Sequence, residues 1–283
     1  MEHLLSSSTL DSLAKSWLHE DLPPLDTGGA VVGRARSRAL LNCKQNCVLA
    51  GRPFFDAIFA QLNCQVNWKF EEGQQLKAPC QAAEVVGATQ DILLGERTAL
   101  NVLTRAAGIA SLTSECVWKA EKAGWKGRVA ATRKTTPGFR VVEKYSVIVG
   151  GGDTHRYSLA SMVMLKDNHI WACGGDFRTA ICKAKSLAGF SQKIEVETRN
   201  REEAITAAKY GADIVMLDNF TPQCALSVSE ELKKQFPNVT IEVSGGLTYH
   251  NMDQYFATSI DVLSMSALTQ GYSTIDFSLK IDH

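Results

Sequence analysis

The segment Thr132-Arg-Lys-Thr-Thr-Pro-Gly-Phe-Arg140 combines three basic side chains with threonine, proline and glycine residues. It begins where an apolar stretch ends, so we expect it to form a loop at the end of a strand. Arg133 and Lys134 supply charge, while the small and turn-forming residues let the backbone approach a ligand closely. A solvated basic loop would have a similar composition. The combination favours a site that grips oxyanions.

Two further basic clusters occur downstream, at Gly150-Gly-Gly-Asp-Thr-His155-Arg156 and at Lys166-Asp-Asn-His169. The second cluster follows the apolar run that ends at Lys166, again at the end of a predicted strand. An isolated histidine such as His169 is more often structural than functional. Three basic clusters on successive loops are predicted to surround one anionic ligand.

Two carboxylates, Glu197 and Asp218, end neighbouring predicted strands. They could accept bonds from loop amides, bind Mg²⁺ through oxygen, or stabilise a developing cation. Glu195 lies two positions before Glu197, on the same side of the strand but further from its end, and is ranked lower. The last two strands end in Ser244-Gly245-Gly246 and Ser264-Met265-Ser266, a position where barrels commonly bind phosphate. These features fit glycosyl transfer from a phosphorylated sugar through an oxocarbenium-like transition state.

The residues after Gly124 alternate short apolar runs with helix-length segments, a pattern typical of a parallel α/β domain. A Rossmann dinucleotide site has no support because no G-x-G-x-x-G motif follows a strand. Polar residues recur at strand ends, which favours a barrel, incomplete because only six strands are clear. The predicted strands are Val129–Thr132, Met162–Lys166, Lys193–Glu197, Asp213–Asp218, Thr240–Val243 and Asp261–Met265.

The residues before Gly124 mix helical and strand patterns. Helices are predicted around Leu10–Leu18 and Pro53–Leu62, and over Ile92–Ala123, where Gly108 is expected to interrupt or kink the helix. Strands are predicted at Val66–Phe70 and Ala83–Val86.

Composition narrows the function classes. The 283 residues carry 30 basic and 30 acidic side chains, so the net charge is zero and nucleic acid is not expected as a partner. No apolar run approaches the length of a membrane span, and no leader peptide is visible, so we expect a cytoplasmic protein. The eight cysteines are then reduced thiols, and Cys43-x3-Cys47 does not complete a zinc site.

The sequence resembles the quinolinate phosphoribosyltransferase family, in its eukaryotic form. The matching motifs follow the family's order over nearly the whole chain. They are Leu94-Gly-Glu-Arg97-Thr-Ala-Leu-Asn101, Thr132-Arg-Lys-Thr-Thr-Pro-Gly138, His155-Arg156-Tyr157, Met164-Leu-Lys166-Asp-Asn-His169, Glu195-Val-Glu197, Leu217-Asp218-Asn219 and Ser244-Gly-Gly246.

The resemblance implies an enzyme of de novo NAD synthesis that uses Mg²⁺. Such enzymes transfer phosphoribosyl from 5-phosphoribosyl-1-pyrophosphate (PRPP) to quinolinate and decarboxylate the adduct to nicotinate mononucleotide. It also implies an N-terminal α/β sandwich domain, residues 1–110, and an incomplete seven-stranded α/β barrel, residues 111–269. The C-terminal tail, about 270–283, would pack with the first domain. Homodimers or hexamers are implied, with Arg97 reaching the active site of the partner subunit.

The resemblance also implies a role for each of the candidate site residues. Arg133, His155, Arg156 and Lys166 would hold the two quinolinate carboxylates, with Thr132 beside them. Lys134, Glu197 and Asp218 would face PRPP, its Mg²⁺ and the anomeric carbon, and are the expected catalytic residues. Ser244, Gly245 and Gly246 would hold the 5′-phosphate.

One departure concerns the last loop, where many relatives carry a glycine at the position of Ser266. A side chain at this position narrows the approach of the backbone to a phosphate bound by Ser264, Met265 and Ser266, although the Ser266 hydroxyl could itself donate a hydrogen bond. Two other functions stay open from the residues themselves. One is a barrel aldolase that uses Lys166 as a Schiff base, and the other is a non-catalytic anion-binding relative. A nuclear pool of the protein is also left open.

Overall fold

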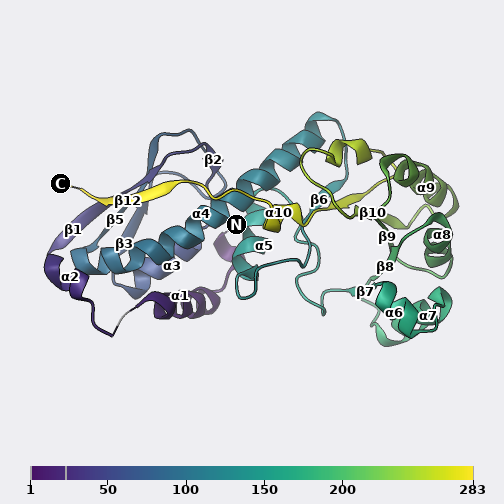
Figure 1. The fold of residues 1–283 in the computed structure, drawn as a ribbon, viewed down its shortest axis with the longest axis horizontal. Helices are drawn as coiled ribbons and strands as arrows, with labels where there is room; N and C mark the ends of the chain where they lie inside the picture. Colours follow the sequence, from purple (N-terminus) through teal and green to yellow (C-terminus); the bar gives the residue numbers. More distant parts are fainter. Residues whose placement is uncertain (1, 23, 283) are drawn as a thin grey trace. The chain divides into compact units, whose positions relative to one another are not determined.

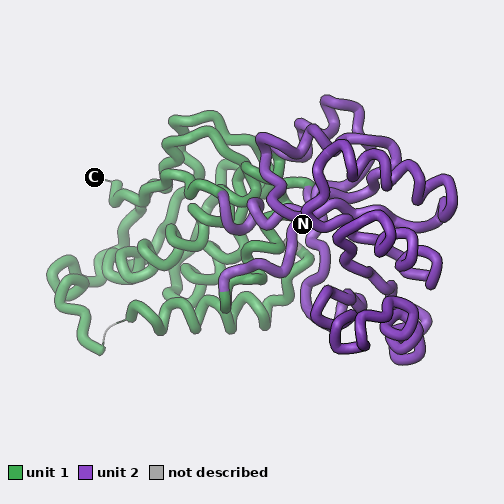
Figure 2. Tube along the Cα trace, turned by 45° about the vertical axis from the view of Figure 1, so that its right-hand side comes forward, with its two compact units in different colours: residues 1–114, 137–151, 272–283 green, residues 115–136, 152–271 purple. Residues whose placement is uncertain are grey.

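A computed structural model of the chain describes residues 2–22 and 24–282, and Met1, Pro23 and His283 lie outside the described part. The chain divides into two compact units (Figure 2). Unit 1 comprises residues 1–114, 137–151 and 272–283, and unit 2 comprises residues 115–136 and 152–271. Residues 137–151, expected in the barrel domain, are grouped with unit 1.

Unit 1 contains a four-stranded antiparallel sheet in the order β12-β1-β5-β3 (Figure 1). The C-terminal strand β12 pairs with β1, the first strand in the sequence, so a segment near the C-terminus completes the sheet of unit 1. The short strands β2 and β4 form a separate two-stranded ladder. The strands of unit 1 are β1 (Arg36–Cys43), β2 (Cys47–Val48), β3 (Gln65–Trp68), β4 (Gln75–Leu76), β5 (Cys80–Ala88) and β12 (Phe277–Ile281).

Helices and sheet in unit 1 enclose one apolar core that includes Leu41, Phe54, Phe55 and Leu103. Its helices are η1 (Glu2–Leu4), α1 (Ser7–Asp21), α2 (Thr27–Val32), α3 (Arg52–Gln61), α4 (Thr89–Lys122) and α5 (Arg140–Val149). Helix α4 continues from unit 1 into unit 2 and runs through Gly108, so the predicted interruption is wrong. A Cβ on Gly108 would lie only 2.2 Å from the carbonyl oxygen of Ser273, so glycine here permits close packing of the C-terminal segment.

Unit 2 contains a six-stranded parallel sheet in the order β6-β11-β10-β9-β8-β7, and all six predicted strands are confirmed. Alanine, valine, isoleucine, leucine and methionine dominate these strands because both faces are buried. The strands are β6 (Arg128–Ala130), β7 (Val163–Leu165), β8 (Ile194–Thr198), β9 (Ile214–Asp218), β10 (Thr240–Ser244) and β11 (Val262–Ser264).

The strand order describes an incomplete barrel. The last strand, β11, pairs with the first, β6, which brings the two ends of the series together. Asp153 adds a single bridge to Ala130 beyond β6, and β7 is paired only with β8 within the described residues, so the wall is open between Asp153 and β7. Unit 2 also contains α6 (Asp167–Ala172), α7 (Phe177–Leu187), α8 (Arg201–Lys209), α9 (Pro222–Gln235), η2 (Met252–Tyr255) and α10 (Ala267–Gln270).

Helix length and hydropathy bear on membrane insertion. Among residues 2–22 and 24–282, we find no helix that combines the length and the apolar character needed to cross a bilayer.

Candidate active site

A cavity of about 460 Å³ lies at the C-terminal ends of the unit 2 strands. Parallel strands present their carboxyl ends at one edge, which is why residues far apart in sequence meet here. Every site residue predicted in unit 2 lines this cavity except Met265. The lining residues are Thr132, Arg133, Lys134, His155, Arg156, Met164, Lys166, Glu197, Met216, Asp218, Asn219, Glu242, Ser244, Gly245, Gly246, Leu247, Ser264 and Ser266.

Two guanidinium groups give the cavity unmet hydrogen-bond donors. The Nε atoms of Arg133 and Arg156 are buried and have no hydrogen-bond partner among the described residues. Arg156 is only 6% exposed, and one of its terminal nitrogens contacts the Met164 sulfur, a weak acceptor, at 3.1 Å. Burial lowers the pKa of Arg156 from its ordinary value. Buried donors without acceptors are costly, so a bound anion would stabilise both groups.

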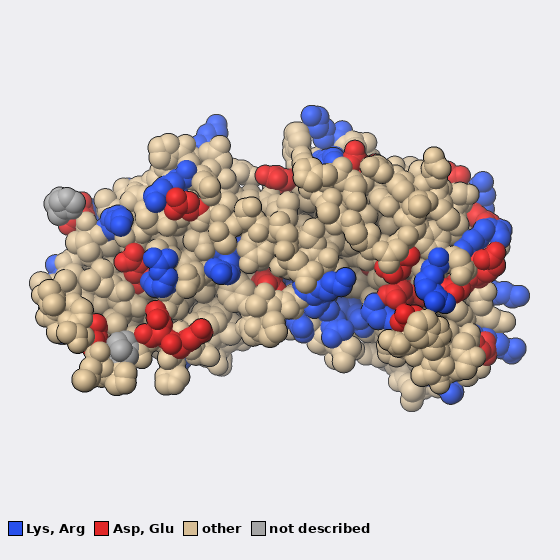
Figure 3. All heavy atoms as spheres, viewed as in Figure 1, with Lys and Arg blue, Asp and Glu red and all other residues tan. Residues whose placement is uncertain are grey.

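Acidic groups occupy another part of the cavity. Lys166 Nζ forms an ion pair with Glu197. The Asn219 side-chain amide donates to an Asp218 carboxylate oxygen at 2.6 Å. Burial, and then the nearby Glu197 carboxylate, raise the pKa of Asp218 above its ordinary value. Figure 3 shows basic atoms next to acidic atoms on this part of unit 2, near the place of β7 and β8 in Figure 1.

The predicted phosphate loop has a backbone that only glycine suits at its centre. Gly245 has a φ of +99°, and a Cβ there would lie 2.3 Å from the Asn219 side-chain oxygen. The Asn219 N–H donates to the Ser244 carbonyl at 2.9 Å, which ties this loop to the end of β9. Phosphate binding by Ser244, Gly245 and Gly246 stays a prediction.

The three residues after β11 differ in what they can contact. Ser264 is buried, and its hydroxyl donates to Glu242 Oε1 at 2.5 Å. Met265 is buried outside the cavity lining, and its N–H donates to the Ala130 carbonyl. Ser266 lines the cavity. Of the three predicted phosphate contacts, therefore, only Ser266 combines a cavity position with a side-chain hydroxyl not already bonded to Glu242.

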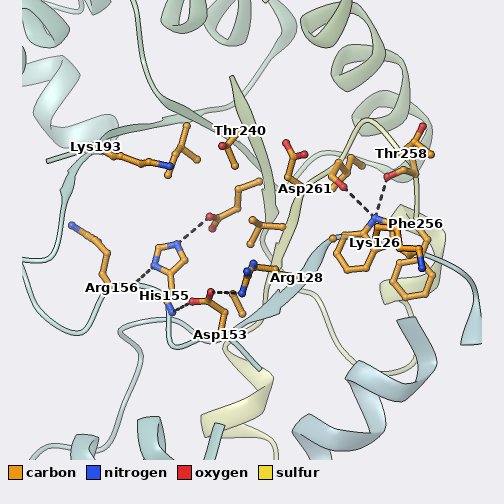
Figure 4. A pocket seen from close by; sticks show the side chains of 18 of the residues that line it. Lys126, Arg128, Asp153, His155, Arg156, Lys193, Thr240, Phe256, Thr258 and Asp261 are labelled. Atoms are coloured by element: carbon orange, nitrogen blue, oxygen red, sulfur yellow. Dashed lines mark hydrogen bonds and ion pairs between the residues drawn. The ribbon is translucent and has the colours of Figure 1, made fainter. Parts of the chain in front are cut away.

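Two buried glutamates beside His155 were not part of the predicted site, and of the two only Glu242 lines the cavity. His155 Nε2 lies 3.0 Å from Glu242 Oε2 and 3.7 Å from Glu195 Oε2. A second cavity, of about 820 Å³, opens at the opposite ends of the strands and shares His155, Arg156 and Glu242 with the first. Figure 4 looks into this second cavity and shows the His155 ring between Arg156 and a strand carboxylate.

The alternation of side chains along a strand could have identified both glutamates as site residues. Glu242 precedes Ser244 by two residues, and Glu195 precedes Glu197 by two, so each shares a strand face with a predicted site residue. Sequence reasoning ranked Glu195 low and did not single out Glu242.

Glu195 is expected to make stability depend on pH. It is fully buried, and no described residue donates a hydrogen bond to either of its carboxylate oxygens. Burial, reinforced by Glu242, raises its pKa to about 9. Between an unfolded pKa near 4.5 and this value, the folded state holds a proton that the unfolded state has lost, so stability falls as pH rises. Thermal unfolding from pH 5 to 9 should show a decline for the wild type and a flatter curve for Glu195→Gln. Parallel curves would contradict this charge state.

Arg97 and His169 lie outside the lining of this cavity. Arg97 lies on α4 in unit 1, where it lines a separate cavity of about 400 Å³ with Asn101 and Arg105. His169 is structural, because its Nδ1 accepts the Lys166 N–H at 3.0 Å and so caps the start of α6.

Known proteins resemble this chain throughout its length. Residues 26–107 match the quinolinate phosphoribosyl transferase N-terminal domain, and residues 109–280 match the C-terminal domain. Nicotinate-nucleotide pyrophosphorylase [carboxylating] of Rattus norvegicus is 51% identical over 281 residues, covering 99% of this chain and 94% of the relative. The human protein of that name is 51% identical over 278 residues, covering 98% and 93%. The solved nicotinate-nucleotide pyrophosphorylase of Francisella tularensis is 30% identical, with a TM-score of 0.90 over 98% of both chains.

Proposed function

The chain belongs to the quinolinate phosphoribosyltransferase family, and from this premise we propose how its residues carry out the family's reaction. Its function is that of the carboxylating nicotinate-nucleotide pyrophosphorylases it resembles, and it is a phosphoribosyltransferase of NAD synthesis. The enzyme transfers the phosphoribosyl group of PRPP to quinolinate and forms nicotinate mononucleotide, CO₂ and pyrophosphate.

The buried Nε–H groups of Arg133 and Arg156 carry the assignment of the quinolinate subsite. Quinolinate presents two adjacent carboxylates. Arg133 and Arg156 line the same cavity, and each has a buried Nε–H that no described residue accepts. Lys166 adds an ammonium group and Thr132 a hydroxyl beside them. Charge-assisted bonds in a largely dry pocket are strong. By holding both carboxylates, these groups would fix the direction of the ring and turn its nitrogen toward the sugar.

The reaction needs two bond exchanges. The bond between the sugar C1′ and pyrophosphate breaks as the quinolinate nitrogen bonds to C1′. The bond between ring carbon C2 and its carboxylate then breaks, CO₂ leaves, and the electron pair left on C2 takes up a proton. The positive ring nitrogen withdraws electrons and makes the second exchange possible without an organic cofactor. The protein contributes positioning and electrostatics.

Lys134, Glu197 and Asp218 are assigned to PRPP. Mg²⁺ would neutralise charge on the pyrophosphate as it leaves. Glu197 and Asp218 fit such an ion, because both carboxylates line one cavity, where burial, and then the charge of Glu197, raise the pKa of Asp218. Lys134 would face the same phosphates. Ser244, Gly245 and Gly246, with Ser266, would hold the 5′-phosphate.

We assign Arg97 to the active site of the partner subunit in a homodimer or in a hexamer built from dimers. Arg97 and Asn101 lie one helical turn apart on α4 and line the same cavity in unit 1.

This assignment predicts complementation between inactive variants. Arg97→Ala and Lys166→Ala should each be nearly inactive alone. Unfolded and refolded together in equal amounts, they should recover roughly a quarter of wild-type activity, since half the dimers are mixed and each has one intact site. Arg105→Ala, mixed with Lys166→Ala in the same way, is the matched control for a neighbouring arginine. Recovery no greater than the sum of the separate variants would contradict a shared site.

The proposed function is tested by incubating purified protein with PRPP, Mg²⁺ and quinolinate labelled at the 2-carboxylate. Nicotinate mononucleotide and labelled CO₂ should appear in equal amounts, and no product would overturn it. The aldolase alternative predicts borohydride trapping of substrate on Lys166. Lys166 is paired with Glu197 and its side chain is 46% exposed, unlike the desolvated lysine that this chemistry uses.

We also propose that the enzyme acts in the cytosol. All eight cysteines, each in the described part of the chain, are free thiols, and the Sγ atoms of Cys43 and Cys47 lie 3.7 Å apart without a bond. Reduced thiols in a protein of this size are typical of that compartment.

A further inference from the structure

Glu242 lies in the middle of β10, is 2% exposed, and connects three elements of the barrel. Its Oε1 accepts the Ser264 hydroxyl of β11 at 2.5 Å, and its Oε2 lies 3.0 Å from His155 Nε2. His155 belongs to the loop beyond Asp153, at the open side of the wall. Both carboxylate oxygens are therefore used to hold neighbours in place.

The hydrogen bonds fix the state of the His155 ring. Nδ1 accepts the backbone N–H of Arg156 at 2.7 Å, so this nitrogen carries no proton. The proton of the neutral ring is then on Nε2, which donates to Glu242. Both ring nitrogens are engaged, as the dashed lines in Figure 4 show, and His155 has no free N–H for an anion.

The backbone at His155 needs this support. Its φ is +54°, in the left-handed region that residues other than glycine seldom adopt, and its N–H donates to Asp153 Oδ1 at 2.7 Å. Bonds that hold such a backbone are expected to fix the direction of the next residue. That residue is Arg156, whose buried Nε–H has no partner among the described residues.

We propose that Glu242 is a positioning residue for quinolinate, acting through the His155 ring to aim Arg156 at a substrate carboxylate. The inference rests on the proposed function, because it takes Arg156 as a quinolinate contact. It adds that the aim of Arg156 is set from the floor of the barrel by a residue that need not touch substrate. The groups assigned to PRPP, Lys134, Glu197 and Asp218, make no hydrogen bond to Glu242 among the described residues.

The test is a comparison of the two substrates. Glu242→Ala should raise the KM and the Kd for quinolinate at least roughly 10-fold, the usual scale for lost bonds to a charged group, and leave both constants for PRPP within about two-fold. Glu242→Gln keeps an acceptor and should restore part of the quinolinate affinity. It also serves as the second variant where alanine prevents folding. Calorimetry measures the two Kd values separately.

Serine variants provide a matched pair. Ser264→Ala removes one bond to Glu242 and should raise the quinolinate KM by a smaller factor. Ser229→Ala removes another buried serine bond of unit 2, to Ser259 at 2.7 Å, and should leave both KM values unchanged.

Equal rises in both KM values, or a lower kcat with both KM values unchanged, would overturn the positioning role and indicate a merely structural one. The outcomes are separable from failure of the proposed function. If the wild type makes no nicotinate mononucleotide, the function itself is wrong. If the wild type is active and the quinolinate constants of Glu242→Ala do not move, only the positioning role is wrong.

Discussion

Arg133→Ala is expected to weaken quinolinate binding roughly 100-fold or more, because a buried charge-assisted contact to a carboxylate is lost. The Arg133 side chain lines the cavity with a buried Nε–H, and among residues 2–22 and 24–282 no group accepts a hydrogen bond from that donor. The variant should therefore keep wild-type thermal stability while its Kd for quinolinate rises. Calorimetric titration with quinolinate measures the change.

The control for Arg133→Ala is Arg201→Ala. Arg201 begins helix α8 of unit 2, and its side chain is 52% exposed and paired with Glu231. Both variants remove one guanidinium group from unit 2. An unchanged quinolinate Kd in Arg133→Ala, or an equal rise in Arg201→Ala, would refute the specific role of Arg133.

Asp218→Asn is expected to lower kcat/KM for PRPP by roughly 100- to 1,000-fold, the scale for loss of one electrostatic group that acts on the transition state. The amide preserves shape but lacks the charge that would hold Mg²⁺ and face the sugar as positive charge develops. The Mg²⁺ concentration for half-maximal rate should rise, and the Kd for quinolinate should change little. Steady-state rates over a Mg²⁺ titration measure both effects.

A surface aspartate provides the control for Asp218→Asn. Asp253→Asn removes an exposed carboxylate of unit 2 that pairs with Lys119 at 2.7 Å. It should leave kcat/KM and the Mg²⁺ requirement unchanged. An Asp218→Asn enzyme with wild-type Mg²⁺ dependence would show that Asp218 does not serve the metal.

The barrel and most of its site could be predicted from sequence because the signals are local. Each buried strand is a short apolar run, and residues at or next to its C-terminal end, such as Lys166, Glu197 and Asp218, occupy the edge where parallel strands present their ends. It could therefore be predicted that these residues line one cavity, without knowing how the strands pack against each other.

Features that depend on contacts between residues distant in sequence could not be predicted from the sequence. His155 looked like a direct anion ligand, yet its ring is bonded to Glu242, 87 residues away in sequence. Residues 137–151 follow a barrel strand but place Val142 and Tyr145 in the core of unit 1. Gly108 looked like a helix breaker because the sequence does not show that Ser273 packs against it. In each case the deciding contact is made by a segment that composition and periodicity do not identify.

The crystal structure of the wild-type enzyme with quinolinate bound tests the central claim most directly. We predict that the guanidinium groups of Arg133 and Arg156 and the ammonium group of Lys166 lie within about 3.2 Å of the ligand's carboxylate oxygens. The ring nitrogen should face the side of the cavity that holds Lys134 and Asp218. Quinolinate bound with its carboxylates turned away from both arginines, or bound outside this cavity, would contradict the assignment.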